Sequence, residues 1–185
     1  MAHMTRMAEM PLRPDVRKAA VLVSLFEKEH AWHTVLIRRK SITGDVHAGQ
    51  ISFPGGRAQT GESLEEAAIR ETQEEIGNLS QHTTIIGGLT SLHIPVSNHL
   101  VFPLVSFIDQ SQLWIPQESE VDFVLEVPIE EFLKEETRVK ASIRSQEGYL
   151  LRDVPCYKVQ GHLIWGATAM ILSEFVAVLV EMSRG

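Results

Sequence analysis

The first apolar runs of the chain, at residues 18–26 and 33–39, are rich in β-branched residues and are separated by a short polar stretch. This arrangement predicts two strands that form a hairpin. Residues 41–63 then concentrate glycine, serine and proline, which predicts a long loop. The hydrophobic periodicity changes at residue 64, where a helix is expected to begin.

Further strands and helices follow in a mixed order. We expect strands at 83–92, 100–108 and 121–128, a short helix at 129–136, hairpin strands at 149–159, and a closing helix from about Ala167 to Met182. This order predicts one α/β domain in which a mixed sheet lies between helices. We assign residues 18–185 to that domain and residues 1–17, which open with a tag-like MAHM, to an N-terminal extension.

The helix expected at residues 64–76 carries acidic and apolar residues on one face. Glu62 and Ser63 are candidate N-cap residues, and Gly77 is a stop signal. At roughly 100° per residue, Glu74 and Glu75 fall within about 60° of Glu71 and continue an apolar stripe. Carboxylates that point into a partly enclosed space repel one another, and a divalent cation would relieve that repulsion. The alternative is a solvated acidic face.

Composition narrows the classes of function. A chain of 185 residues with 44% hydrophobic content can bury the core of one domain. Its net charge of −7 argues against duplex nucleic acid as a partner, so a polyanionic substrate would need a cation or a local arginine cluster. One cysteine, no signal peptide and no apolar run long enough for a bilayer favour the cytoplasm and no membrane partner. A homodimer is a general expectation.

The acidic helix is part of a longer pattern with fixed spacing. Its members are Gly56, Glu62, Arg70, Glu71, Glu74, Glu75 and Gly77. This pattern resembles the Nudix box, in which a glycine, a glutamate, an Arg-Glu pair, a Glu-Glu pair and a glycine recur at these intervals. Thr72 and Asn78 stand where the family usually has aliphatic residues, which affects packing rather than ligand positions.

The resemblance extends beyond the box to the coenzyme A diphosphatase branch of the Nudix hydrolases. Residues 36–56, 94–105, 120–133 and 162–172 are similar to segments of that branch. One position differs in charge, because Gly44 and Asp45 replace the Leu-Arg pair that branch members commonly carry. An anion near a substrate with several phosphates weakens the case for coenzyme A itself.

The resemblance implies a Nudix-like α/β/α sandwich with a central mixed β-sheet and a metal-dependent hydrolase of a diphosphate linkage. Coenzyme A or acyl-CoA is the leading substrate, giving phosphopantetheine and adenosine 3′,5′-bisphosphate. ADP-ribose, nucleotide sugars or nucleoside triphosphates are alternatives within the same chemistry. A third alternative is a Nudix ligand-binding module without turnover.

The resemblance also implies roles for individual residues. Mg²⁺ or Mn²⁺ would be held by Glu71, Glu74, Glu75 and the carbonyl of Gly55. Arg70 is expected to orient the carboxylates rather than contact substrate. Glu120 resembles the extra glutamate that acts as general base in many members, with Glu118, Asp122, Glu71 and Glu74 as alternatives.

Substrate contacts are expected at a second set of residues. Arg38 and Arg39 could bind a phosphate, or could serve only as solubilising charges at a strand edge. Gly56 permits close approach of the backbone to a phosphate. Ser97 and Asn98 fit a ligand contact and a simple turn equally well.

Overall fold

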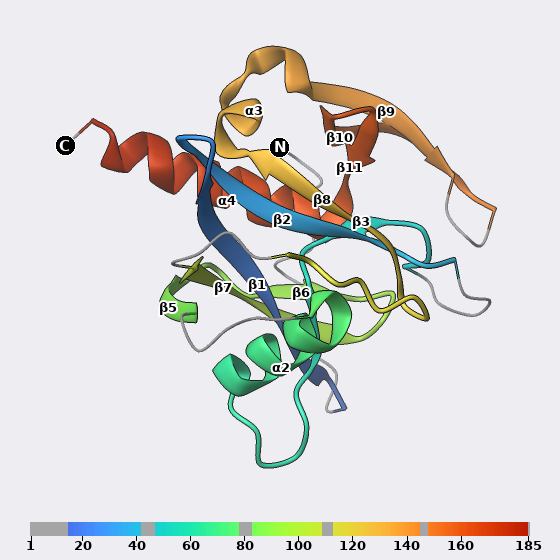
Figure 1. The fold of residues 1–185 in the computed structure, drawn as a ribbon. Coiled ribbons are helices and arrows are strands. Elements are labelled where there is room, and N and C mark those ends of the chain that lie inside the picture. The colour runs from blue at the N-terminus through green and yellow to red at the C-terminus, as the bar shows by residue number, and fades with distance from the viewer. Residues whose placement is uncertain (1–14, 42–46, 78–82, 109–112, 145–147, 185) are drawn as a thin grey trace.

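The structure is a computed structural model, and it describes residues 15–41, 47–77, 83–108, 113–144 and 148–184 (Figure 1). The central sheet contains β1 (Arg17–Lys28), β2 (Ala31–Arg39), β3 (Ile51–Ser52), β4 (Gly55–Arg57), β5 (Thr83–Gly88), β6 (Leu92–Ile94), β7 (His99–Ile108) and β8 (Val121–Pro128). β1 and β7 are parallel, whereas all the other pairs are antiparallel. The predicted central mixed sheet is confirmed.

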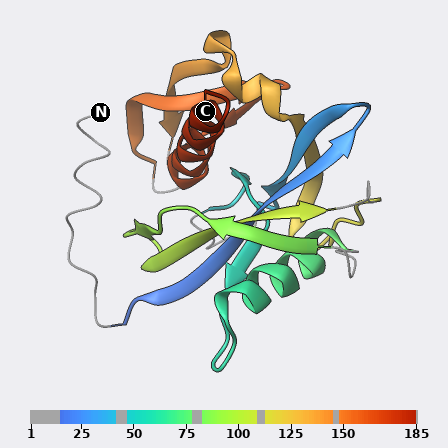
Figure 2. The same cartoon turned by 90° about the vertical axis from the view of Figure 1, so that its left-hand side faces the viewer.

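Helices cover both faces of this sheet. α2 (Leu64–Ile76) lies on one face, and α3 (Ile129–Leu133) and α4 (Gly166–Met182) lie on the other (Figure 2). The alternation of side chains along β1 supplies both cores. Ala20 and Leu22 pack in the core that includes residues of α2, whereas Val23 packs in the core that includes residues of α4.

A second sheet of three strands differs from the expectation. It contains β9 (Arg138–Arg144), β10 (Leu150–Val159) and β11 (His162–Ile164), in the order β11-β10-β9. Residues 150–159 form one strand, and its two antiparallel partners lie outside the range in which hairpin strands were expected. The partners are set by pairing across the sheet, which the local pattern does not reveal.

Two smaller boundaries also differ. The helix expected at 129–136 ends at Leu133, because Lys134 is extended, and a 3₁₀ turn follows at Glu135–Thr137. The strand expected at 83–92 is divided into β5 and β6. Within the described residues, no helix has both the length and the apolar character needed to cross a bilayer. The domain boundary at residue 17 stays a prediction, since residues 1–14 lie outside the described part.

Candidate active site

Helix α2 has well-defined ends that fix the direction of its side chains. The Ser63 hydroxyl accepts the backbone N–H of Glu66 at 3.2 Å, and the Glu66 carboxylate accepts the N–H of Ser63 at 2.9 Å. This is a capping box. Gly77 ends the helix with a φ of 67°, and its N–H donates to the carbonyl of Gln73 at 2.9 Å. Ser63 is therefore the N-cap, and the alternative candidate Glu62 is not.

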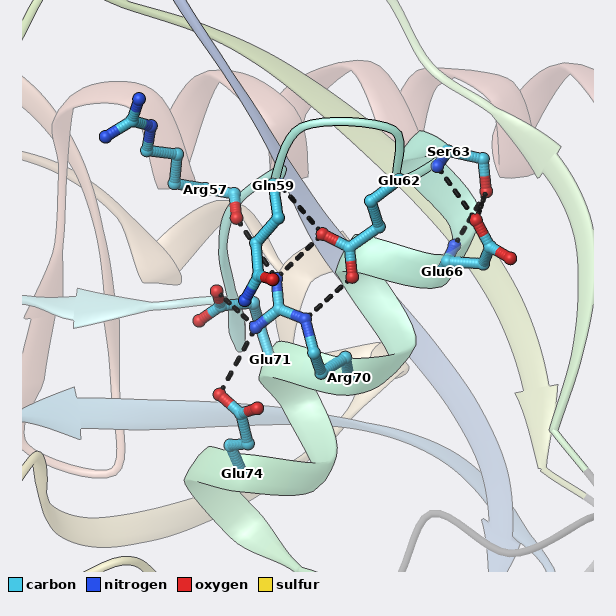
Figure 3. Close-up of polar contacts among 8 residues, drawn as sticks. All are labelled: Arg57, Gln59, Glu62, Ser63, Glu66, Arg70, Glu71 and Glu74. Carbon is cyan, nitrogen blue, oxygen red and sulfur yellow. Dashed lines mark hydrogen bonds and ion pairs between the residues drawn. The ribbon is translucent and has the colours of Figure 1, made fainter.

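Arg70 connects three of the acidic residues on and next to the helix (Figure 3). Its guanidinium binds both carboxylate oxygens of Glu62, at 2.7 and 2.9 Å, and donates to Glu71 at 2.8 Å. It also reaches Glu74 at 3.3 Å and the carbonyl of Arg57 at 3.1 Å. Five acceptor atoms thus surround one guanidinium, and the role of Arg70 in orienting the carboxylates stays a prediction.

The Glu62–Arg70 pair shifts both partners toward their charged forms. Hydrogen bonds from Arg70, and then from the backbone N–H of Gln59, lower the pKa of Glu62 to about 2. The bond from Glu62, and then that from Glu71, raise the pKa of Arg70. Both groups stay ionised across the physiological range, so this brace does not titrate. The role of Glu62 was not predicted from the sequence.

The two glycines of β4 allow the strand to approach its neighbours very closely. A Cβ atom on Gly56 would lie 2.3 Å from Oε2 of Glu71, well inside any real contact. Gly55 has a φ of 139°, and a Cβ atom there would lie 2.3 Å from the carbonyl oxygen of Ala20. Side chains at these positions are excluded for different reasons: at Gly56 by the carboxylate, and at Gly55 by β1 and the backbone conformation.

Glu75 is the most buried acidic residue of α2, at 2% exposure. Its carboxylate accepts the N–H of Gly55 at 2.8 Å and lies 3.5 Å from the guanidinium of Arg39. Burial raises the pKa of Glu75 to about 7, opposed by Gly55 and Arg39 and reinforced by the charges of Glu71 and Glu120. A group that titrates near neutrality therefore lies beside the ionic brace.

The segment before β8 carries Glu120 toward Glu75. Helix α2 ends with carbonyl groups that have no partner within the helix. The N–H of Ile115 donates to the carbonyl of Ile76, and the N–H of Gln117 donates to that of Glu75, both at 2.8 Å. These two bonds dock residues 113–120 on the end of α2, and they place the exposed Glu120 close enough to influence Glu75 electrostatically.

Glu74 differs from its two neighbours. Its side chain is 59% exposed and contacts Arg70, whereas that of Glu71 is 21% exposed. Across the ranges that the structure describes, no three His, Cys, Asp or Glu side chains converge in a way that could hold an ion. The expectation of an enclosed space thus fits Glu75, fits Glu71 in part, and fails for Glu74, which lies at the solvent edge of the helix.

Comparisons with known proteins show the family to which the chain belongs. The family model for the NUDIX domain matches residues 16–146. The chain belongs to the Nudix family. It is 33% identical over 180 residues to Nudix hydrolase 15, mitochondrial, of Arabidopsis thaliana, covering 92% of this chain and 61% of that relative. It is 34% identical to the uncharacterized Nudix hydrolase NudL of Pectobacterium atrosepticum, covering 88% and 84%.

Solved structures support the fold alone. A MutT/nudix family protein from Enterococcus faecalis has a TM-score of 0.55 at 15% identity, covering 97% of this chain and 68% of that one. The Nudix hydrolase RenU of M. smegmatis has a TM-score of 0.53 at 17% identity, covering 62% and 72%. This chain spans about three-fifths of the length of the Arabidopsis relatives that it matches, at 61% and 58%.

The Nudix box offers a donor set that suits a hard divalent ion. The carboxylates of Glu71 and Glu75 and the carbonyl of Gly55 are oxygen donors, which Mg²⁺ and Mn²⁺ prefer. Gly55 and Glu75 are already joined by a hydrogen bond, and the lack of a side chain at Gly56 lets the Glu71 carboxylate lie against β4. The chemistry of these donors therefore fits such an ion, although no three of the described acidic side chains already converge.

The residues expected to bind substrate lie in three places: beside the carboxylates of α2, against β8, and in the turn before β7. Arg39 reaches Glu75, whereas Arg38 turns toward β8, with its Nε 3.7 Å from Asp122 and its guanidinium over the ring of Phe123. Gly56 lies against Glu71. Ser97 and Asn98 lie in the turn before β7, beside the start of β1. Gly44, Asp45 and Asn78 lie outside the described residues.

Proposed function

We propose that this chain hydrolyses a phosphoanhydride linkage in a small-molecule diphosphate, with Mg²⁺ or Mn²⁺ held by Glu71, Glu74, Glu75 and the carbonyl of Gly55. One observation supports this most strongly. The buried carboxylate of Glu75 is bonded to the glycine strand and lies beside Glu71, which Arg70 orients. A solvated acidic face would have neither the burial nor the brace.

Each residue of the proposed site has its own role in the reaction. When bound, the ion would neutralise charge on the phosphoryl oxygens and lower the pKa of an attacking water. Arg70 keeps Glu71 and Glu74 in position, and Gly56, which has no side chain, lets the Glu71 carboxylate lie against β4. Glu120 would accept the proton of the water. Asp122 is less suited to this role because it is paired with Arg38.

Coenzyme A or an acyl-CoA is the substrate that we propose, with phosphopantetheine and adenosine 3′,5′-bisphosphate as products. The similarity of residues 36–56 to the coenzyme A branch supports this choice. Arg38, Arg39, Gly56, Ser97 and Asn98 remain the proposed substrate contacts. A second candidate is ADP-ribose or a related nucleotide, since Asp45 replaces a cation that the coenzyme A branch commonly has. The cytoplasmic location and the homodimer stay predictions.

The substrate is tested with a panel of diphosphates. Purified protein with Mg²⁺ should release product from coenzyme A with a higher kcat/KM than from ADP-ribose, a nucleotide sugar or a nucleoside triphosphate, as followed by chromatography. A higher kcat/KM on ADP-ribose would establish the second candidate. Ligand binding without product from any compound would support a binding module.

The ion site is tested by a matched pair of variants on one helix. Glu71→Gln should lower kcat by about 100-fold or more, because it removes a charged oxygen donor without changing shape. Glu65→Gln, an exposed carboxylate in the first turn of α2, is the control and should keep activity. Activity of Glu71→Gln near that of the control would reject the assignment of Glu71.

A further inference from the structure

Two arginines and a histidine lie together on the central sheet, close to β4. Arg17 and His99 are direct partners across the parallel strands β1 and β7, and Ala19 of β1 is the partner of Arg57 in β4. Residues that are paired across strands share a face, as do residues two apart along one strand. Arg17, Arg57 and His99 therefore surround Ala19 on one face of the sheet.

This face is the one opposite to α2. Val21 and Val23 continue the row of Arg17 and Ala19 and pack in the core that includes α4. Figure 3 shows the Arg57 side chain pointing away from Arg70 and its carboxylates, although the carbonyl of the same residue binds Arg70. The backbone of β4 thus contacts the carboxylate site, while its one large side chain, that of Arg57, lies on the same face as Arg17 and His99.

The positive charge of this group comes from Arg17 and Arg57, because His99 is held toward its neutral form. The pKa of His99 is held below its ordinary value, first by burial and then by the charge of Arg17, with His47 and Arg57 adding to it. No described Asp or Glu forms an ion pair with Arg17 or Arg57. Asp15 is the acidic residue nearest to Arg17 in the sequence, and its backbone carbonyl accepts a hydrogen bond from the side-chain amide of Asn98. In a protein of net charge −7, such a surface attracts anions.

The turn before β7 holds this group together. Asn98 has a φ of 52°; its carbonyl accepts the N–H of Arg17 at 3.0 Å, and its side-chain amide donates to the carbonyl of Asp15 at 3.2 Å. Asn98 thereby fixes the start of β1. The backbone of Ser97 acts on His99 in the opposite sense to burial and raises its pKa.

We propose that Arg17, Arg57 and His99 bind a second phosphate of the substrate, a phosphate monoester that is not hydrolysed. This rests on the proposed function. Arg57 is two residues from Gly55, about 7 Å along the strand, and its side chain extends further from that point. A substrate that carries an anhydride and a monoester on one ribose fits this separation. A guanidinium can bind such a phosphate through two parallel hydrogen bonds.

The test compares coenzyme A with dephospho-coenzyme A, which lacks only the monoester phosphate. The protein should have the higher kcat/KM on coenzyme A. Arg57→Gln and Arg17→Gln should each raise KM for coenzyme A by about tenfold, the effect of one charge-assisted contact, and leave kcat and all values for dephospho-coenzyme A unchanged. Arg152→Gln, an exposed arginine on β10, is the control and should change nothing.

Equal losses on both substrates would overturn the proposal, because the arginines would then act on the anhydride or by general attraction. A second measurement needs no turnover. By calorimetry, adenosine 3′,5′-bisphosphate should bind about 100-fold more tightly than adenosine 5′-monophosphate, and Arg57→Gln should lower that ratio by about tenfold. Equal binding of the two nucleotides would overturn the subsite whether or not coenzyme A is hydrolysed. A retained difference without hydrolysis would overturn only the substrate assignment.

Discussion

At Glu75, the demands of stability and of chemistry conflict. The side chain is 2% exposed, and burial raises its pKa from an ordinary 4.5 to about 7. At a pH between these two pKa values, the unfolded chain has released the proton of Glu75, whereas the folded protein still holds it. The contribution of protonated Glu75 to the free energy of unfolding is therefore complete below about pH 4.5. It is lost as the pH rises through 7.

Glu75→Gln should remove this dependence in the metal-free protein. Its amide oxygen can still accept the N–H of Gly55, but there is no charge to bury. At pH 8 the variant should have a free energy of unfolding roughly 3 kcal/mol above that of the unchanged protein, and at pH 5 the two should be close. Denaturant unfolding at several pH values measures this. Glu65→Gln should show no such trend, and a gap independent of pH would contradict the role of burial.

Helical spacing predicted part of the site at the level of single residues. Arg70, Glu71 and Glu75 are close because their angles on one helix bring them together. The different environments of Glu74 and Glu75 depend on β4 and on residues 113–120, which pack against only one side of the helix. The bond from Arg70 to Glu62 depends on the path of the intervening loop, which no local pattern specifies.

The start of α2 shows how two adjacent residues serve different purposes. Ser63 bonds to the helix backbone and Glu62 bonds to a side chain on the next turns. Ser63→Ala should lower the free energy of unfolding by about 1 kcal/mol, since it removes an N-cap acceptor, and lower the Tm by about 2–4 °C with kcat almost unchanged.

Glu62→Gln should lower kcat by about tenfold or more, because a neutral amide binds the Arg70 guanidinium less strongly than a carboxylate does.

Calorimetry and steady-state kinetics on both variants separate the two roles. If Glu62 acts through Arg70, then the double variant Glu62→Gln/Arg70→Gln should lose less activity than the product of the two single losses. Independent, multiplicative losses would show that Glu62 has another role. Full activity in Glu62→Gln would remove it from the site altogether.

Elements with a strong local pattern were predicted, and those that depend on distant pairing were not. β1, β2, β7 and β8 are long apolar strands, and α2 has a capping residue and a glycine stop. β9 alternates mostly exposed and half-buried residues, so its sequence has no strong apolar pattern, and its pairing with β10 defines it as a strand. β3 and β4 are two and three residues long and lie in a glycine-rich stretch, where pairing with β2 and β1 defines them.

At the scale of the whole molecule, three distant segments meet at Glu75. β4 donates the N–H of Gly55, the end of β2 supplies Arg39, and the segment before β8 bonds through Gln117 to the carbonyl of Glu75 itself. An ion held here would contact elements from much of the sequence. Because the unfolded chain does not bring these elements together, binding should stabilise the entire fold.

Mg²⁺ should therefore raise the Tm, by about 5–10 °C when its concentration is about 100 times the Kd, corresponding to about 2.7 kcal/mol. The ion requires an ionised Glu75, whose pKa in the metal-free protein is about 7, so binding must displace a proton at lower pH. The increase should be larger at pH 8 than at pH 6. Glu75→Gln should show little increase at either pH, whereas Glu65→Gln should behave as the unchanged protein. An increase that is independent of pH and survives Glu75→Gln would place the ion away from this helix.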